Sequence, residues 1–166
     1  MKFHISLFIK IIILSFLALC QNIYADEFGI VIKVIDGDTV YLLNHNDKKL
    51  KVRLQHIDAP ELNQPFGEES KMILERFILK KNIMLIGHKK DKYKRLLGVI
   101  SLDGLDINLE MIKIGAAWHY KKYAKFDQLS EQYLMYDENE QKAKSKELGL
   151  WRENAIPPWL WRKNKK

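Results

Sequence analysis

Four acidic residues in the first half of the chain are the groups best suited to chemistry. Asp36 and Asp38 flank a glycine, and Asp58 and Glu61 form a second pair after the next strand-like run. They are hard oxygen donors with no cysteine and no ordered pair of histidines nearby. A metal bound by them would therefore be Ca²⁺, Mg²⁺ or Mn²⁺ rather than zinc.

Each acidic pair also has a purely structural interpretation. Asp36-Gly37 is a strong signal for a type I′ turn, and the segment 58–61 can end a strand with its carboxylates in water. Taken one at a time, the pairs favour this turn interpretation.

Two arginines complete the candidate chemistry. Arg53 lies between the acidic pairs, and Arg95 ends the basic stretch 88–95. Guanidinium groups hold phosphate oxygens in a fork geometry, so arginines, carboxylates and a hard metal together suit phosphoryl transfer. For Arg95 the alternative is a solvated hairpin tip among lysines, which the charge pattern alone favours.

The strands that would position these groups follow from runs of apolar and β-branched residues separated by turn signals. They are predicted at 28–35, 39–43, 49–57, 82–87 and 96–102. Within 49–57 the period of two puts Val52 and Leu54 on one face and Arg53 on the other. Arg53 is therefore expected to point away from the main core, toward solvent or a site.

Three helices are predicted between and after the strands. The first begins near Glu68, the second is capped by Asn108 and ends near Gly115, and the third covers about 130–146 with Gly149 past its end. Strands and helices in this order predict an α+β chain whose five strands can close as a small Greek-key barrel. An oligonucleotide-binding (OB) barrel is one member of that class, and periodicity alone does not select it.

The amino terminus has the layout of a secretory signal peptide. Basic residues precede an apolar run over 11–20, and a polar stretch leads to a cleavage site before Asp26. The run is too short to cross a bilayer as a helix, which needs about 20 residues. The alternatives are a buried helix and a lipoprotein modified at Cys20. Cleavage after residue 25 would leave 26–166 as one domain without cysteine, which excludes disulfides and thiolate sites.

The composition is basic. The chain carries 28 Lys and Arg against 21 Asp and Glu, a formal net charge of +7. This balance suits an anionic partner such as nucleic acid, although it is also common on surfaces that bind none.

Three motifs resemble those of the staphylococcal nuclease (thermonuclease) family, in the same order and with similar spacing. They are VIDGDTV at 34–40, VRLQHIDAPE at 52–61 and DKYKR at 91–95. The segment EQYL at 131–134 and the later Gly149-Leu150-Trp151 look like the family's last helix and the turn after it. The resemblance implies a five-stranded OB barrel with three helices that hydrolyses DNA and RNA phosphodiesters with Ca²⁺.

The resemblance also implies roles for the acidic residues. Asp38 and Asp58 match the metal carboxylates, and Ala59 matches a position, often threonine in the family, that offers its backbone carbonyl to the metal. Asp36 matches an acidic neighbour that acts on the metal through water. Glu61 matches the glutamate assigned as base for the attacking water.

The remaining matches concern the substrate. Arg53 and Arg95 match the two catalytic arginines, and we assign Arg95 to charge stabilisation because a guanidinium stays protonated. Tyr93 matches a tyrosine beside the phosphate. Either Tyr120 or Tyr123 is expected to stack on a base, with packing against the barrel rim as the alternative. Lysines are expected to attract the substrate, namely Lys92, Lys94, Lys121 and Lys122.

The resemblance thus implies a monomer with no stable protein partner, acting on single-stranded or frayed DNA and RNA. The signal peptide adds export, to a secreted or periplasmic location. The alternative function is a catalytically inactive barrel that only binds nucleic acid.

Overall fold

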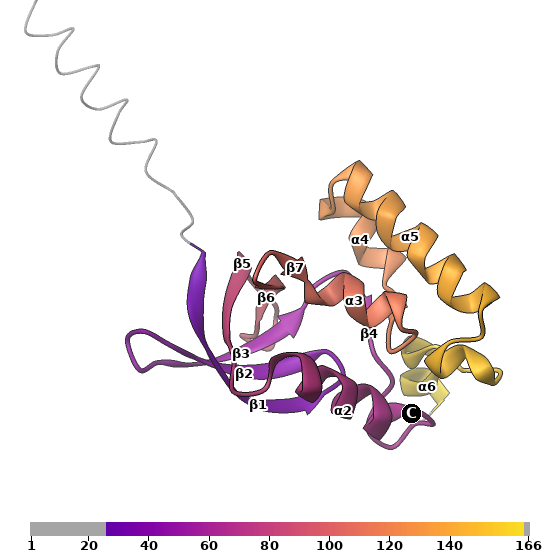
Figure 1. Ribbon diagram of the computed structural model, residues 1–166, viewed down its shortest axis with the longest axis horizontal. Coiled ribbons are helices and arrows are strands. Elements are labelled where there is room, and N and C mark those ends of the chain that lie inside the picture. The colour runs from indigo at the N-terminus through magenta and orange to yellow at the C-terminus, as the bar shows by residue number, and fades with distance from the viewer. Residues whose placement is uncertain (1–25, 165–166) are drawn as a thin grey trace, which may run out of the picture.

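The structure is a computed structural model that describes residues 26–164, apart from the side chain of His88 (Figure 1). The predicted signal peptide therefore lies outside the described residues. Within 26–164, no helix combines the length and apolar character that a membrane span requires.

Five strands form a closed barrel, which confirms the predicted α+β class and OB-type fold. The strand order is β3-β2-β1-β5-β6, and β3 also pairs in parallel with β6 to close the barrel. The barrel strands are β1 (Glu27–Asp36), β2 (Thr39–Asn44), β3 (Lys49–Leu54), β5 (Asn82–Lys90) and β6 (Leu96–Leu102). The short strands are β4 (Ile57–Asp58), β7 (Leu105–Asp106) and β8 (Trp118–His119), of which β7 extends the barrel sheet and β4 pairs with β8.

The core lies inside the barrel and under its helices. Strand residues that alternate along the chain point inward and are fully buried, as at Val40 and Leu42 or Val52 and Leu54. Helical side chains close the core, among them Leu74, Ile78, Met111 and Ile112. Each such aliphatic side chain stabilises the fold by roughly 1.5–3 kcal/mol relative to exposure.

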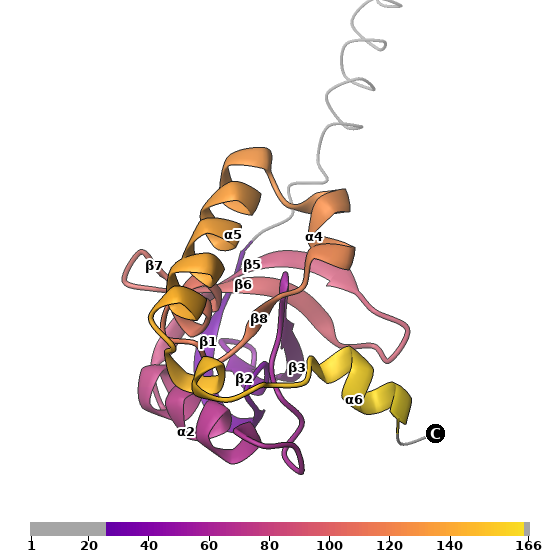
Figure 2. The ribbon, with the colours of Figure 1, turned by 90° about the vertical axis from the view of Figure 1, so that its right-hand side faces the viewer.

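The three predicted helices are present, together with two further short helices and one 3-10 turn. The predicted ones are α2 (Gly67–Ile78), α3 (Ile107–Lys113) and α5 (Ser130–Ser145). The others are α4 (Lys121–Asp127), α6 (Pro158–Asn164) and a 3-10 turn, η1 (Gly149–Arg152). Figure 1 shows α3 between the barrel and α5, while Figure 2 shows α6 beside the end of the barrel that carries β3.

The second helix begins differently from the sequence prediction. Asp106, not Asn108, is its N-cap, because the Asp106 carboxylate accepts a hydrogen bond from the Leu109 amide at 2.9 Å. Asn108 is fully buried instead, and its amide group receives a bond from the Ile100 N–H and donates to the carbonyls of Gln55 and Gly98. A helix side chain therefore ties α3 to the strands where the barrel closes.

The third predicted strand is also shorter than expected. It ends at Leu54, because His56 adopts a left-handed backbone with φ 66° and the chain turns before β4. The turn is held from outside the strand, since the Gln55 amide donates to the Gly98 carbonyl and the Tyr120 amide to the His56 carbonyl. The segment 57–61 is thereby directed across the barrel end.

One buried histidine links this fold to pH. His119 on β8 is 1% exposed and packs edge-on against the rings of Tyr133 and Tyr136. Its Nε2 pairs with Gln128 at 3.0 Å, and its buried Nδ1 has no hydrogen-bond partner within the described part of the chain. Burial lowers the pKa of His119 below its ordinary value of 6.5, and the bond to Gln128 opposes that effect only in part.

We predict that stability falls as pH drops below about 6.5 because the unfolded chain takes up a proton that folded His119 resists. The contribution is complete above the unfolded pKa and is lost as pH decreases. Urea unfolding between pH 7.5 and pH 5 should give a shallower pH slope for His119→Gln than for the unchanged chain. His45→Gln, in the exposed turn after β2, is the control and should leave the slope unchanged. Equal slopes in all three proteins would contradict the prediction.

Candidate active site

The first acidic pair forms the turn between β1 and β2. The Asp36 carboxylate accepts a hydrogen bond from the Asp38 amide at 3.0 Å, and the chain turns here as predicted. The predicted type I′ geometry is wrong, because that type needs positive φ at both central residues and none of Asp36, Gly37 and Asp38 has it. The turn is not solvated, however, because Asp38 is only 5% exposed. At Gly37 an added Cβ would lie 2.0 Å from the Ser70 hydroxyl oxygen on α2, so the absence of a side chain lets the turn pack against that helix.

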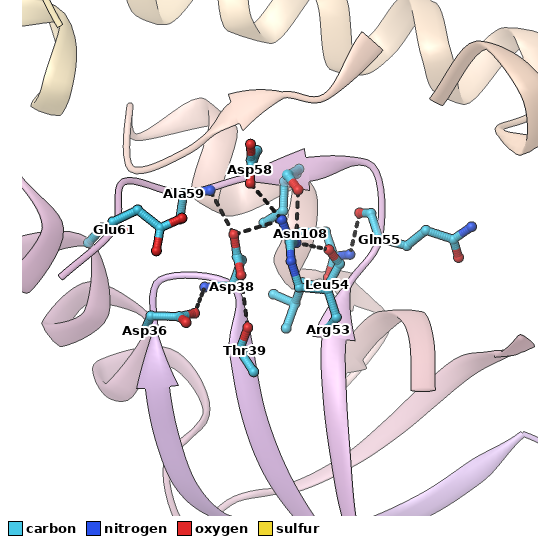
Figure 3. Close-up of polar contacts among 12 residues, drawn as sticks. Asp36, Asp38, Thr39, Arg53, Leu54, Gln55, Asp58, Ala59, Glu61 and Asn108 are labelled. Atoms are coloured by element: carbon cyan, nitrogen blue, oxygen red, sulfur yellow. Dashed lines mark hydrogen bonds and ion pairs between the residues drawn. The ribbon is translucent and has the colours of Figure 1, made fainter. Parts of the chain in front are cut away.

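Arg53 joins this turn to the second acidic segment (Figure 3). Its Nη2 lies 2.9 Å from Asp38 Oδ2 and 2.8 Å from Asp58 Oδ1. Its Nη1 donates to the carbonyls of Leu54 and Ile57, at 2.5 and 2.9 Å. Arg53 therefore points away from the buried face of β3, as the alternation predicts, and its fork fastens the turn that carries Asp58.

The second acidic segment is held by β4 and by Asp38. Asp58 on β4 pairs with Trp118 on β8 and is 1% exposed. The Ala59 amide donates to Asp38 Oδ2 at 2.8 Å. Glu61 is half-buried, and its backbone N–H donates to the side chain of Gln64 at 3.2 Å. The two acidic pairs thus converge, although a solvated strand end was the simpler expectation for the second.

Buried negative charge dominates the electrostatics. Burial and the neighbouring charge of Asp38 raise the pKa of Asp36 to about 7, against the opposing effects of the Asp38 amide and Arg53. Burial also raises the pKa of Asp58, while the guanidinium groups of Arg53 and Arg162 oppose that rise. Added positive charge would stabilise this cluster.

Arg95 approaches from the hairpin between β5 and β6. Asp91 organises this loop, because its Oδ1 accepts from the amides of Tyr93 and Arg95 and its Oδ2 lies 2.7 Å from both Arg95 Nε and Nη2. Because Arg53 pairs with Leu97 across the β3–β6 closure, the hairpin that ends at Arg95 lies beside the strand that carries Arg53. The Arg95 side chain is 25% exposed, which argues against a free hairpin tip.

A cleft of about 790 Å³ lies between the acidic segments and the hairpin that carries Arg95. Most of the predicted site residues line it, namely Asp36, Asp38, Arg53, Asp58, Ala59, Glu61, Lys92, Tyr93, Arg95, Tyr120 and Tyr123. Three predicted lysines do not: Lys94 is absent from its lining, and Lys121 and Lys122 line a separate hollow beside α6. The structure therefore brings the three sequence motifs to one surface.

The tyrosines divide between exposed and packed positions. Tyr93 is 67% and Tyr123 56% exposed, and both line the cleft. Tyr120 stacks on Trp159 of α6, with ring centroids 5.4 Å apart and planes 7° apart. Lys121 is ion-paired with Asp137 and Glu140 of α5, so its charge is partly neutralised there.

Sequence reasoning missed three participants. Arg162 on α6 reaches Asp58 and Glu61, Trp159 covers Tyr120, and Asp91 clamps Arg95. The only sequence signal for Arg162 is the group of basic residues at the end of the sequence, because its partners lie 101 and 104 residues away. Asp91 is part of the DKYKR motif, so its position was visible while its role was not.

The donor set suits a hard divalent cation. Carboxylate and carbonyl oxygens are the ligands that Ca²⁺ prefers. Asp38 and Asp58 present carboxylate oxygens beside Arg53, and the backbone of Ala59 is held next to them by its amide bond to Asp38. No group of three or more His, Cys, Asp or Glu side chains among residues 26–164 is already arranged around a common point for a metal. Arg53 and Arg162 hold the carboxylates instead.

Comparison with known proteins agrees with this geometry. A family model described as staphylococcal nuclease homologue matches residues 51–153. An uncharacterized endonuclease of Haemophilus influenzae is 44% identical over 82% of this chain and 73% of its own length. An uncharacterized endonuclease of Escherichia coli O157:H7 is 34% identical over 92% and 94%, and a micrococcal nuclease of Shigella flexneri is 35% identical over 86% and 84%.

The match covers the second acidic segment, Arg53, the Arg95 hairpin and all helices up to η1. With a closed five-stranded barrel and both arginines in one cleft with the carboxylates, the chain belongs to the staphylococcal nuclease family.

Proposed function

We propose that this protein is an exported, Ca²⁺-dependent endonuclease that hydrolyses phosphodiester bonds of DNA and RNA with little sequence preference. The observation that carries the proposal is the position of Arg53, which joins Asp38 and Asp58 in a cleft shared with Glu61 and Arg95. Carboxylates for a cation and guanidinium groups for a phosphate are thereby combined in one site. The endonuclease and nuclease names of the relatives support the same reaction class.

In this mechanism Asp38, Asp58 and the Ala59 carbonyl would hold Ca²⁺, and Asp36 would add negative charge beside them. When bound, the cation supplies Lewis-acid polarisation of a phosphate oxygen. Glu61 accepts a proton from the water whose oxygen forms the new bond to phosphorus, while the bond from phosphorus to one sugar oxygen breaks and that oxygen takes a proton from solvent. Arg53 and Arg95 donate hydrogen bonds to the phosphate oxygens, on which negative charge grows in the transition state.

The cleft also suits a single-stranded or frayed substrate. Tyr93 and Tyr123 expose rings on which bases can stack, and stacking tolerates any base because each has a π-face. Lys92 adds positive charge beside Tyr93, with its Nζ 5.0 Å from the ring centroid. These features favour binding without sequence preference.

Cation dependence is the first test. We expect the purified mature protein to cleave single-stranded DNA and RNA with Ca²⁺ and to lose activity with a chelator, because the buried carboxylates need a counter-charge to hold the phosphate. Gel assays with Ca²⁺, Mg²⁺ and chelator measure this. Cleavage that persists in chelator would refute the cation mechanism, and binding without cleavage under every condition would support the inactive-barrel alternative.

The catalytic groups form the second test. Glu61→Gln and Arg53→Lys should each lower turnover about a hundredfold or more, the scale for loss of one preorganised electrostatic group. Arg53→Lys retains the charge beside the buried carboxylates, so the fold should survive. Glu69→Gln on the exposed side of α2 and Lys51→Ala on β3 are matched controls that should retain activity. Near-normal rates for both site variants, with folding intact by circular dichroism, would mean that the site is wrongly assigned.

Export is tested separately. We expect mass spectrometry of the protein from expressing cells to find Asp26 as the first residue, because the polar stretch before it fits signal peptidase cleavage. A lipid-modified Cys20 or an intact amino terminus would indicate membrane attachment and leave the chemistry unaffected.

A further inference from the structure

The carboxyl-terminal helix α6 is docked onto the candidate active site at several points. Trp159 stacks on Tyr120, and Pro158 is buried. Just before the helix, the Ile156 carbonyl accepts a hydrogen bond from the side chain of Gln64. The Trp161 ring N–H lies 3.3 Å from the side-chain oxygen of Asn63. The helix is therefore fixed against the loop that follows Glu61.

This docking directs Arg162 onto the acidic cluster. Arg162 Nη2 lies 2.7 Å from Asp58 Oδ2, and Nη1 lies 2.7 Å from Glu61 Oε1 and 3.3 Å from Asp58 Oδ1. Arg53 already contacts Asp58 Oδ1, so guanidinium groups occupy both oxygens of Asp58. For Glu61, Arg162 is the ion-pair partner.

Such an arrangement conflicts with cation binding at the same oxygens. A guanidinium and a divalent cation use the same carboxylate lone pairs, and their like charges repel each other at this range. Asp58 is 1% exposed, so solvent screens the repulsion weakly on its side. The Arg162 side chain is 42% exposed, which gives it room to leave.

We propose that Arg162, which also pairs with Glu61, competes with the divalent cation for Asp58, and that α6 thereby sets the cation affinity of the site. This inference rests on the proposed cation dependence and adds a residue outside the motifs that carry the family resemblance. Arg162 acts on the cation indirectly, by occupying the carboxylate oxygens that would bind it. Its removal should strengthen cation binding, whereas loss of an ordinary site residue would weaken it.

The test measures Ca²⁺ binding to the mature protein by calorimetry, without nucleic acid. Arg162→Ala should lower the dissociation constant about tenfold, the scale of one charge-assisted contact reduced for partial solvent exposure. Arg162→Lys keeps the charge and loses the fork, so its change should be smaller. Trp159→Ala loosens α6 and should also strengthen binding, which provides a second route if Arg162→Ala folds poorly.

Lys163→Ala is the matched control. Lys163 carries the same charge on the same helix and lines a different surface hollow from the one that holds Asp58. Its removal should change the dissociation constant less than about twofold, since exposed charges are screened by salt. If Lys163→Ala and Arg162→Ala lowered the Ca²⁺ dissociation constant equally, the effect would come from net charge alone. That result would overturn the proposal.

The remaining outcomes are also decisive. Unchanged or weaker Ca²⁺ binding in Arg162→Ala would overturn the competition, and weaker binding of single-stranded DNA in that variant would then assign Arg162 to the substrate. If neither the unchanged protein nor any variant binds Ca²⁺, both the competition and the proposed cation dependence are refuted. Cleavage assays on the unchanged protein decide separately whether the nuclease proposal survives.

Discussion

The parallel pairing of β3 with β6 is the contact on which the site depends. It closes the barrel and aligns Arg53 with Leu97, so the hairpin that carries Arg95 emerges beside the strand that carries Arg53. Asn108 strengthens the closure from α3 by binding the backbone of both sides, at Gln55 and Gly98. The closure of the barrel therefore determines both where the buried core ends and how Arg53 and Arg95 come to line the same cleft.

The second constraint is the cost of burying like charges. Asp38 and Asp58 are almost fully buried, and two carboxylates at such proximity are tolerated only with compensating positive charge and hydrogen bonds. Arg53 supplies both, and the Ala59 amide adds a bond to Asp38. A site held this tightly is preorganised, which is how fixed charges contribute most to catalysis.

The carboxyl-terminal segment gives the cleft a wall that the barrel does not provide. Through Trp159 and Arg162, α6 contacts a base-stacking candidate and the acidic cluster together. Figure 2 shows α6 beside the end of the barrel that carries β3. Residues after the family match at 51–153 thus form part of the site. On the competition proposed for Arg162, variation in this segment would change cation affinity while the barrel and the motifs stay the same.

Much of the fold and half of the site follow from local pattern. Alternation over β3 buries Val52 and Leu54 and turns Arg53 outward, and the motifs identify both acidic pairs, because side-chain direction and turn chemistry depend on near neighbours. Tertiary structure decided the rest: that Asp106 caps α3, that Lys121 pairs with α5, and that Arg162 reaches Asp58 from 104 residues away. Local periodicity determines which face of its own strand or helix a side chain lies on. Which distant group that side chain contacts depends on how the barrel closes and on the path of the helical segment that follows it.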